Sequence, residues 1–209
     1  IKEVASPFIP SATGFNYENE QVTKNSRLTL TFASDFCTIL VSFDRIILRY
    51  EGDPSDLRKN NSIFEEPFLN LFNKIKAHKD FGKATNVLFY TIYIKPEESV
   101  TKESIIESFL KNNAITETAN KIITQPSDAS IILKKSVGDS QIQIQYGPYL
   151  GIDDLTSRNA VPVLKHIEKI DRMLGKMAEI SFVDNATNYT FSKYKETVDK
   201  SNELMSKIQ

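Results

Sequence analysis

The stretch Phe36–Tyr50 constrains the fold most strongly, because it consists largely of β-branched, aromatic and other apolar residues. Such residues favour extended strands, yet a run of about fourteen residues exceeds the usual length of a single strand. We therefore predict that a turn or bulge near Ser42–Arg45 divides the stretch. Apolar residues alternate with small polar ones at 28–33 and predict a half-buried strand immediately before it.

Later segments alternate between the helical and the extended period. Apolar residues follow helical spacing in four segments, namely 64–79, 101–112, 161–177 and 190–208. Thr101 is the expected N-cap of the second helix and Pro162 opens the third. Strands are predicted at 87–95, 130–135, 141–146 and 179–183. The stretch Val87–Lys95 is apolar on both sides, which is typical of an interior strand covered on both faces.

These elements predict an α+β fold with a mixed or antiparallel sheet and helices on one face. After an N-terminal arm at 1–27, a first half at 28–124 and a second half at 125–209 share one order of elements: strand, strand, helix, strand, helix. We expect the two halves to pack as one unit. An ancient duplication and a coincidence of short elements both explain the shared order.

Composition narrows the class of protein. The chain has 209 residues, one cysteine and a formal net charge of -1. A near-neutral charge argues against nucleic acid as the main ligand, because phosphate neutralisation needs a basic surplus. One cysteine forms no intramolecular disulfide and excludes a zinc site built mainly on thiolates. With neither a long apolar run nor a signal-peptide pattern at residue 1, we expect a cytoplasmic protein with no membrane partner.

Three stretches together resemble a known family: Asp35–Tyr50, a helix and strand that end with Val87–Ile94, and Ala178–Asp184 followed by the terminal helix. Their order is similar to that of a sporadically distributed family of uncharacterised bacterial proteins of about this size. The resemblance covers about two thirds of the chain. It implies a bacterial setting and patchy inheritance, as in mobile or defence-related genes, and brings no known reaction.

The chain departs from that family at its most distinctive strand. There the family typically reads Leu-Arg-Tyr-Ile-Asn, whereas this chain has Phe89-Tyr90-Thr91-Ile92-Tyr93. The family's arginine and asparagine are therefore missing, and no catalytic residue is carried over.

The sequence contains no recognisable catalytic or metal-binding motif, and we predict no catalytic residue, no metal and no cofactor. Cys37 lies in an apolar stretch, as buried structural cysteines do. His78 and His166 have no second histidine or carboxylate at ligand spacing. The pair Asp153-Asp154 suits a helix cap better than acid/base chemistry.

Two arginines are the candidate ligand-binding residues. On a continuous strand, Arg45 and Arg49 would point to the same side and could clamp a small anionic ligand. Pairing with Asp44 or Glu51 within the chain is the competing interpretation.

The predicted strands at 130–135 and 141–146 are expected to form a hairpin, which supplies a candidate interaction surface. The residues of this surface are polar but uncharged: Gln141, Gln143, Gln145, Tyr146 and Tyr149. Such a strand face suits a protein contact. We therefore expect a non-enzymatic binding or protein-interaction module of a bacterial accessory or defence system, with a protein partner or self-association. The alternative is an enzyme of unfamiliar type that uses loop carboxylates or the arginine pair on an anionic ligand.

Overall fold

The computed structural model describes residues 5–18, 26–53, 70–79, 85–185 and 191–208. The chain forms two compact units. Unit 1 comprises residues 1–84 together with 162–166, and unit 2 comprises 85–161 and 167–209. The sequence, by contrast, placed the division between two halves at residue 124.

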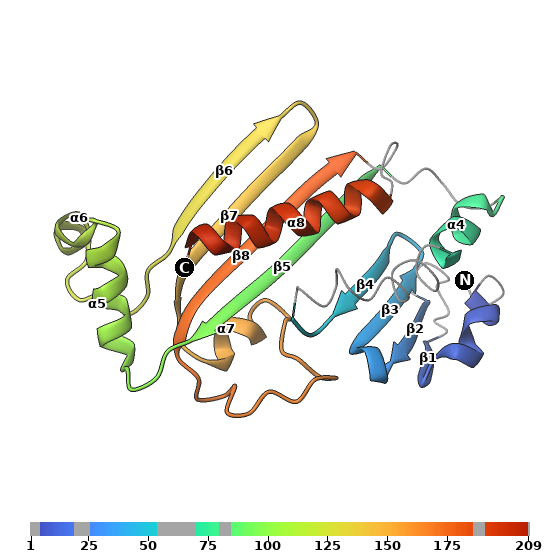
Figure 1. Cartoon of the computed structure of the whole chain (residues 1–209), viewed down its shortest axis with the longest axis horizontal. Helices are drawn as coiled ribbons and strands as arrows, with labels where there is room; N and C mark the ends of the chain where they lie inside the picture. The colour runs from blue at the N-terminus through green and yellow to red at the C-terminus, as the bar shows by residue number, and fades with distance from the viewer. Residues whose placement is uncertain (1–4, 19–25, 54–69, 80–84, 186–190, 209) are drawn as a thin grey trace. The chain divides into compact units, whose positions relative to one another are not determined.

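Unit 1 contains a four-stranded antiparallel meander (Figure 1), with β1 (Gly14–Glu18), β2 (Arg27–Phe32), β3 (Cys37–Ser42) and β4 (Ile46–Tyr50) in sequence order. The predicted turn lies between β3 and β4, as Ser42–Arg45 suggested. Every second residue of β2 and β3 is buried, which reflects the alternation in the sequence. The described helical elements of the unit are η1 (Ser6–Ser11), η3 (Ala33–Asp35) and α4 (Asn70–Ala77). The first part of the helix predicted at 64–79 lies outside the described residues.

Unit 2 is built on a second antiparallel sheet with the strand order β5-β8-β7-β6. Its strands are β5 (Asn86–Pro96), β6 (Ile131–Val137), β7 (Ser140–Tyr149) and β8 (Gly175–Asn185). The last strand of the chain, β8, lies between β5 and β7 (Figure 1). The structure thus has the predicted α+β fold, with two antiparallel sheets and several helices.

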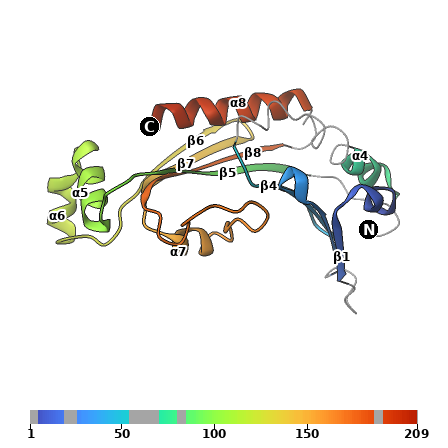
Figure 2. The ribbon, with the colours of Figure 1, turned by 60° about the horizontal axis from the view of Figure 1, so that its bottom comes forward.

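Helical elements lie on both sides of the unit 2 sheet (Figure 2). On one side α8 (Phe191–Ile208) crosses the strands. Ser201 of α8 is fully buried against the sheet, and its Oγ is within hydrogen-bond distance of Thr91 Oγ1 (3.2 Å) and the Tyr93 hydroxyl (2.9 Å). On the other side lies α7 (Ile152–Thr156), where a core of Tyr149, Leu155 and Met177 is packed against Ile92, Ile94, Ala160, Val161, Ile170 and Met173.

Two short helices connect β5 to β6. The first, α5 (Lys102–Asn112), begins at the predicted N-cap: Thr101 Oγ1 accepts from Ser104 N and Ser104 Oγ accepts from Thr101 N. The second, α6 (Thr116–Ile122), was not predicted, because its seven residues are mostly polar and show little helical periodicity.

Three local predictions were wrong. The strand β5 is an edge of its sheet, and Leu88 is 63% exposed, so apolar residues on both sides did not mean an interior strand. Residues 162–174 form bends and turns instead of a helix, and Lys169 has a φ of +57°, outside the helical range. Finally, β7 does not end at residue 146 but continues through Gly147-Pro148 to Tyr149. The absence of a side chain at Gly147 allows the backbone of Ala129 and Ser130 to lie close to this part of the strand.

The distal part of α8 packs on the fold rather than projecting from it. In the sequence, Ser201 and Asn202 interrupt the apolar stripe of this helix. In the structure Met205 is 8% exposed, and Asn202 Oδ1 accepts a hydrogen bond from the Tyr93 hydroxyl (2.9 Å). The two polar residues therefore continue the contact with the sheet.

Candidate functional site

Within the described residues of unit 2, part of the sheet face opposite α8 is uncovered, and we call it the open face. It is formed by side chains that the strand register places on that side: Leu88, Tyr90, Ile132, Lys134, Gln141, Gln143, Ser181 and Val183. Leu88, Tyr90 and Ile132 are 63%, 41% and 51% exposed. The core around α7 covers only the neighbouring end of this face, at Ile92 and Ile94. An exposed sheet face that mixes apolar, aromatic and amide groups resembles the composition of protein interfaces.

An ion pair lies at the margin of the open face and was not found from the sequence. Arg158 Nε donates to Glu179 Oε2 at 2.8 Å, and both side chains are about one-fifth exposed, at 21% and 19%. Burial, followed by the charge of Glu179 and a hydrogen bond to it, raises the pKa of Tyr90 to about 12. The single hydroxyl proton of Tyr90 is thus directed to Glu179, and its oxygen remains an acceptor.

The structure separates the predicted interaction residues. Gln141, Gln143 and Gln145 share the side opposite α8, as the alternation predicted, and Gln143 and Gln145 are half-buried. Tyr146 lies on the other side, where its hydroxyl donates to Asn113 Oδ1 (2.9 Å). Tyr149 is 0% exposed and its hydroxyl donates to Ile170 O (3.3 Å), so its ring belongs to the core.

The two candidate arginines of unit 1 each contact a neighbouring carboxylate. Arg45 lies in the turn before β4 and donates to Asp44 Oδ2 through Nε (3.1 Å) and Nη2 (2.6 Å). These hydrogen bonds are the main cause that lowers the pKa of Asp44 to about 2. Arg49 Nη2 lies 3.0 Å from Glu51 Oε1.

Glu51 is the most engaged carboxylate in unit 1. Its side chain is 5% exposed, and Oε2 accepts hydrogen bonds from three backbone amides, those of Val163 (2.8 Å), Leu164 (2.7 Å) and Lys165 (3.2 Å). The carboxylate thus holds the segment 162–166 within its unit. Because Arg49 faces this carboxylate, part of the positive charge of Arg49 is already compensated.

The other single residues show structural roles. Cys37 is fully buried, and this burial raises the pKa of its thiol to about 12, far from the range of a reactive thiolate. Asp153 and Asp154 lie in the first turn of α7, where Asp154 Oδ2 accepts from Leu150 N (2.7 Å). His166 is exposed and His78 is half-buried. Within the described ranges, no three metal-ligating side chains come together.

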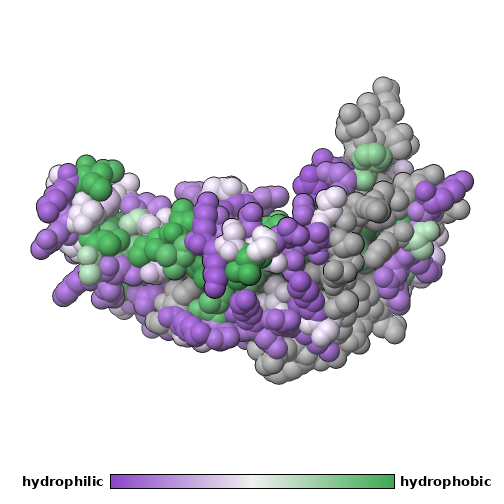
Figure 3. Space-filling model, turned by 90° about the horizontal axis from the view of Figure 1, so that it is seen from above, coloured by the Kyte–Doolittle hydropathy of each residue, from purple (hydrophilic) through white to green (hydrophobic). Residues whose placement is uncertain are grey.

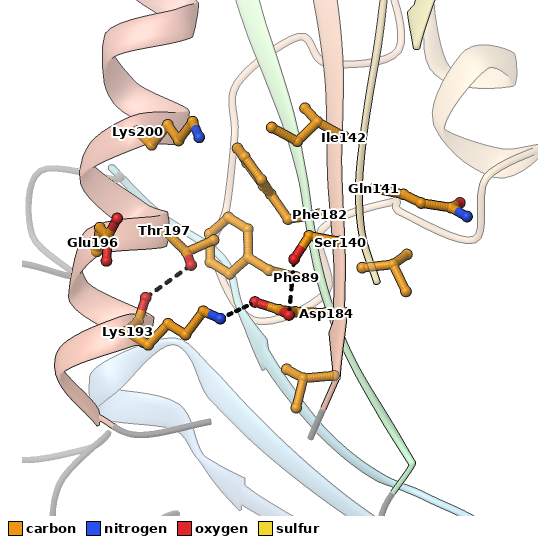
Figure 4. A pocket seen from close by; sticks show the side chains of 12 residues that line it. Phe89, Ser140, Gln141, Ile142, Phe182, Asp184, Lys193, Glu196, Thr197 and Lys200 are labelled. Carbon is orange, nitrogen blue, oxygen red and sulfur yellow. Dashed lines mark hydrogen bonds and ion pairs between the residues drawn. The ribbon is translucent and has the colours of Figure 1, made fainter. Parts of the chain in front are cut away.

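Unit 2 also has a shallow pocket of about 150 Å³ between α8 and the sheet (Figure 4). Its apolar floor includes Phe89, Ile142 and Phe182, and its polar rim comprises Ser140, Asp184, Lys193, Glu196, Thr197 and Lys200. Phe89 makes edge-to-face contacts with Phe182 and with Tyr194 of α8, each at 6.1 Å between ring centroids. These contacts fill the interior and leave little depth for a ligand.

Asp184 organises the rim of this pocket (Figure 4). Its carboxylate accepts hydrogen bonds from Ser140 Oγ (3.0 Å) and Asn185 N (2.8 Å), and it forms an ion pair with Lys193 Nζ. The hydrogen bond from Lys193 is the main cause that lowers the pKa of Asp184 below its ordinary value. An acid whose oxygens are occupied and whose pKa is lowered is a poor general base at neutral pH. The cluster instead joins the β6–β7 hairpin, β8 and α8.

The Asp184 cluster should make stability depend on pH. Because folding lowers the pKa of Asp184, its contribution is present above the ordinary pKa of 3.8 and is lost as the pH falls through the lowered folded value. We expect Asp184→Asn to cost about 1 kcal/mol at pH 7, since the partly exposed pair is screened. Chemical denaturation at pH 7 and near pH 2.5 measures the difference. An equal cost at both pH values would contradict this origin.

A comparison of the chain with models of protein families, with curated proteins and with solved structures found no match. Among the described residues, none of the helices combines the length and hydrophobicity needed to cross a lipid bilayer.

Proposed function

We propose that this protein is a non-enzymatic interaction module that binds a protein partner through the open face of its unit 2 sheet. The observation that carries the proposal is the exposure of Leu88 and Tyr90, at 63% and 41%, on the same sheet face as the amide side chains of Gln141 and Gln143, with β8 between them. Apolar side chains at the centre of an interface are desolvated on binding, and amides give directional hydrogen bonds. The proposal includes that the protein acts in the cytoplasm, as a component of a bacterial accessory or defence system.

The chemistry of the open face specifies the partner. Lys134 is exposed at one margin, and Arg158 lies at another but is compensated by Glu179. The partner that fits is a protein surface with an apolar region facing Leu88 on β5 and acidic groups facing Lys134 on β6, the two edge strands of the sheet. Tyr90 gives its hydroxyl proton to Glu179 and offers the partner its ring and an acceptor oxygen.

An enzyme acting on an anionic ligand receives less support. Arg45 and Arg49 face Asp44 and Glu51, so the arginine pair does not present two uncompensated charges. Asp153 and Asp154 lie in the first turn of a short helix and do not border the pocket between α8 and the sheet.

The test uses a double variant of the open face, Leu88→Glu with Gln143→Arg, and a control at the pocket rim, Lys200→Glu. Partners are captured from cells that carry the gene, and their affinity is then measured by calorimetry with both purified proteins. We expect the double variant to weaken binding at least about tenfold, or about 1.4 kcal/mol, and the control to bind normally. Equal binding by the double variant, or loss only with Lys200→Glu, would overturn the proposal.

A further inference from the structure

The strand β6 forms one edge of the unit 2 sheet and exposes apolar residues along it. Ile132, Leu133 and Val137 are 51%, 55% and 61% exposed, and Ile122 and Ile123, at the end of α6, are 75% and 59% exposed. Figure 3, a view from above, shows hydrophobic residues in green at the left and centre of this face, with hydrophilic residues between them. A long apolar edge strand is a template for pairing with another strand.

The turn between β6 and β7 shows which backbone groups of β6 point outward. Val137 pairs with Ser140 across the two residues Gly138 and Asp139, and Gly138 has a φ of +58°. The residues that flank a two-residue hairpin turn are a hydrogen-bonded pair, and such pairs alternate along the ladder. The N–H and C=O groups of Ile132, Lys134 and Ser136 therefore point away from β7.

We infer that β6 pairs antiparallel with β6 of a second copy of this chain, so that the two four-stranded sheets join into one continuous sheet across a two-fold axis. The axis passes at Ile132, which lies opposite Ile132 of the second copy as a hydrogen-bonded pair. This inference rests on the backbone edge of β6 and does not depend on the proposed function. The two share the side chains of Ile132 and Lys134, but the test of the open face uses Leu88 on β5 and Gln143 on β7.

The sequence of β6 is self-complementary in this register. Ile131 lies opposite Leu133 of the second copy, and Ile132 lies opposite its own counterpart, so the three consecutive apolar residues cover one another. Lys134 then lies opposite Ser130 and diagonal to Asp128, whose carboxylate is within reach of a long side chain. A register centred on Lys134 would instead bring two lysines face to face, which is destabilising. The charges thus select a second copy in one register.

Cysteine cross-linking tests the register. In the proposed dimer the two Ile132 Cα atoms lie about 5.5 Å apart, within the range of a disulfide, whereas the two Lys134 Cα atoms are offset by about 14 Å along the strands. Cys37 is buried and does not compete. We expect Ile132→Cys to give a disulfide-linked dimer under mild oxidation and Lys134→Cys to remain monomeric on a non-reducing gel. Linkage of both variants, of Lys134→Cys alone, or of neither would overturn the register.

The mass in solution tests the dimer itself. Light scattering of the full chain at about 0.5 mM should give the mass of a dimer, because association follows mass action. Ile132→Glu should give a folded monomer, since it places two carboxylates face to face, whereas Leu88→Glu should remain a dimer. Circular dichroism verifies that both variants fold. A monomeric parent chain, or a dimeric Ile132→Glu variant, would overturn the inference. If Ile132→Glu abolishes the dimer and Leu88→Glu does not, the dimer is supported whether or not the protein binds a partner through the open face.

Discussion

Replacement of Glu51 by alanine should lower the free energy of unfolding by about 3 kcal/mol, a large part of the stability of a typical domain. The substitution removes a 5% exposed carboxylate that accepts three backbone hydrogen bonds from residues 163–165 and faces Arg49. The amides and the guanidinium would lose their partner in a partly buried place, which costs more than the loss of the bonds alone. The segment 162–166, which forms no helix or strand, would lose its main anchor in unit 1.

Urea denaturation followed by circular dichroism measures this effect, because the chain contains no tryptophan for fluorescence. Arg45→Ala is the matched control: it removes an ion pair whose side chains are 64% and 55% exposed and should leave stability unchanged, because solvent screens the pair. Glu51→Gln, which keeps one acceptor oxygen, should fall between the two. Equal stability of the Glu51→Ala and Arg45→Ala variants would contradict the role assigned to Glu51.

Gly175→Ala should destabilise the protein by about 2–3 kcal/mol through overpacking. A Cβ atom at Gly175 would lie 2.1 Å from the carbonyl oxygen of Lys95 and 2.9 Å from the Cα atom of Pro96. Both are backbone atoms of β5, so no side chain can rotate away and the start of β8 must separate from β5. The expected result is a clear fall in the melting temperature.

Gly14→Ala in β1 is the control for this prediction. Its Cβ atom would meet Thr31 Cβ at 3.9 Å, an ordinary contact, and alanine lowers the entropy of the unfolded chain. We therefore expect unchanged or slightly higher stability. If the two glycine variants had the same melting temperature, the close approach of β5 and β8 would not be a constraint.

Local patterns in the sequence predicted the elements that depend on neighbouring residues. The turn at Ser42–Arg45, the cap at Thr101 and the hairpin around Gly138-Asp139 are set by turn chemistry and short-range periodicity, and all three are found. The α+β class followed from the same patterns.

Features that depend on distant residues were not predictable in this way. Val87–Lys95 is apolar on both sides, yet it is an edge strand of its sheet. One of its sides faces α8, and the other includes the exposed side chain of Leu88. Segment 162–174 has helical spacing but gives its first amides to Glu51, a residue more than a hundred positions earlier. The pairs Ser140–Asp184 and Arg158–Glu179 likewise depend on the register of β8, which no local signal specifies.

The strand order β5-β8-β7-β6 also sets the order in which unit 2 can fold. The β6–β7 hairpin forms from neighbouring residues, but β5 pairs only with β8, where Asn86 meets Asn185. On the ribosome β5 therefore leaves the exit tunnel long before its partner strand is synthesised. Contacts so distant in sequence slow folding, and an unpaired apolar strand is prone to aggregate while it waits. Unit 2 thus remains incomplete until β8 and the helix that covers it have left the ribosome, which makes truncation near the C-terminus more damaging than the loss of a surface helix would suggest.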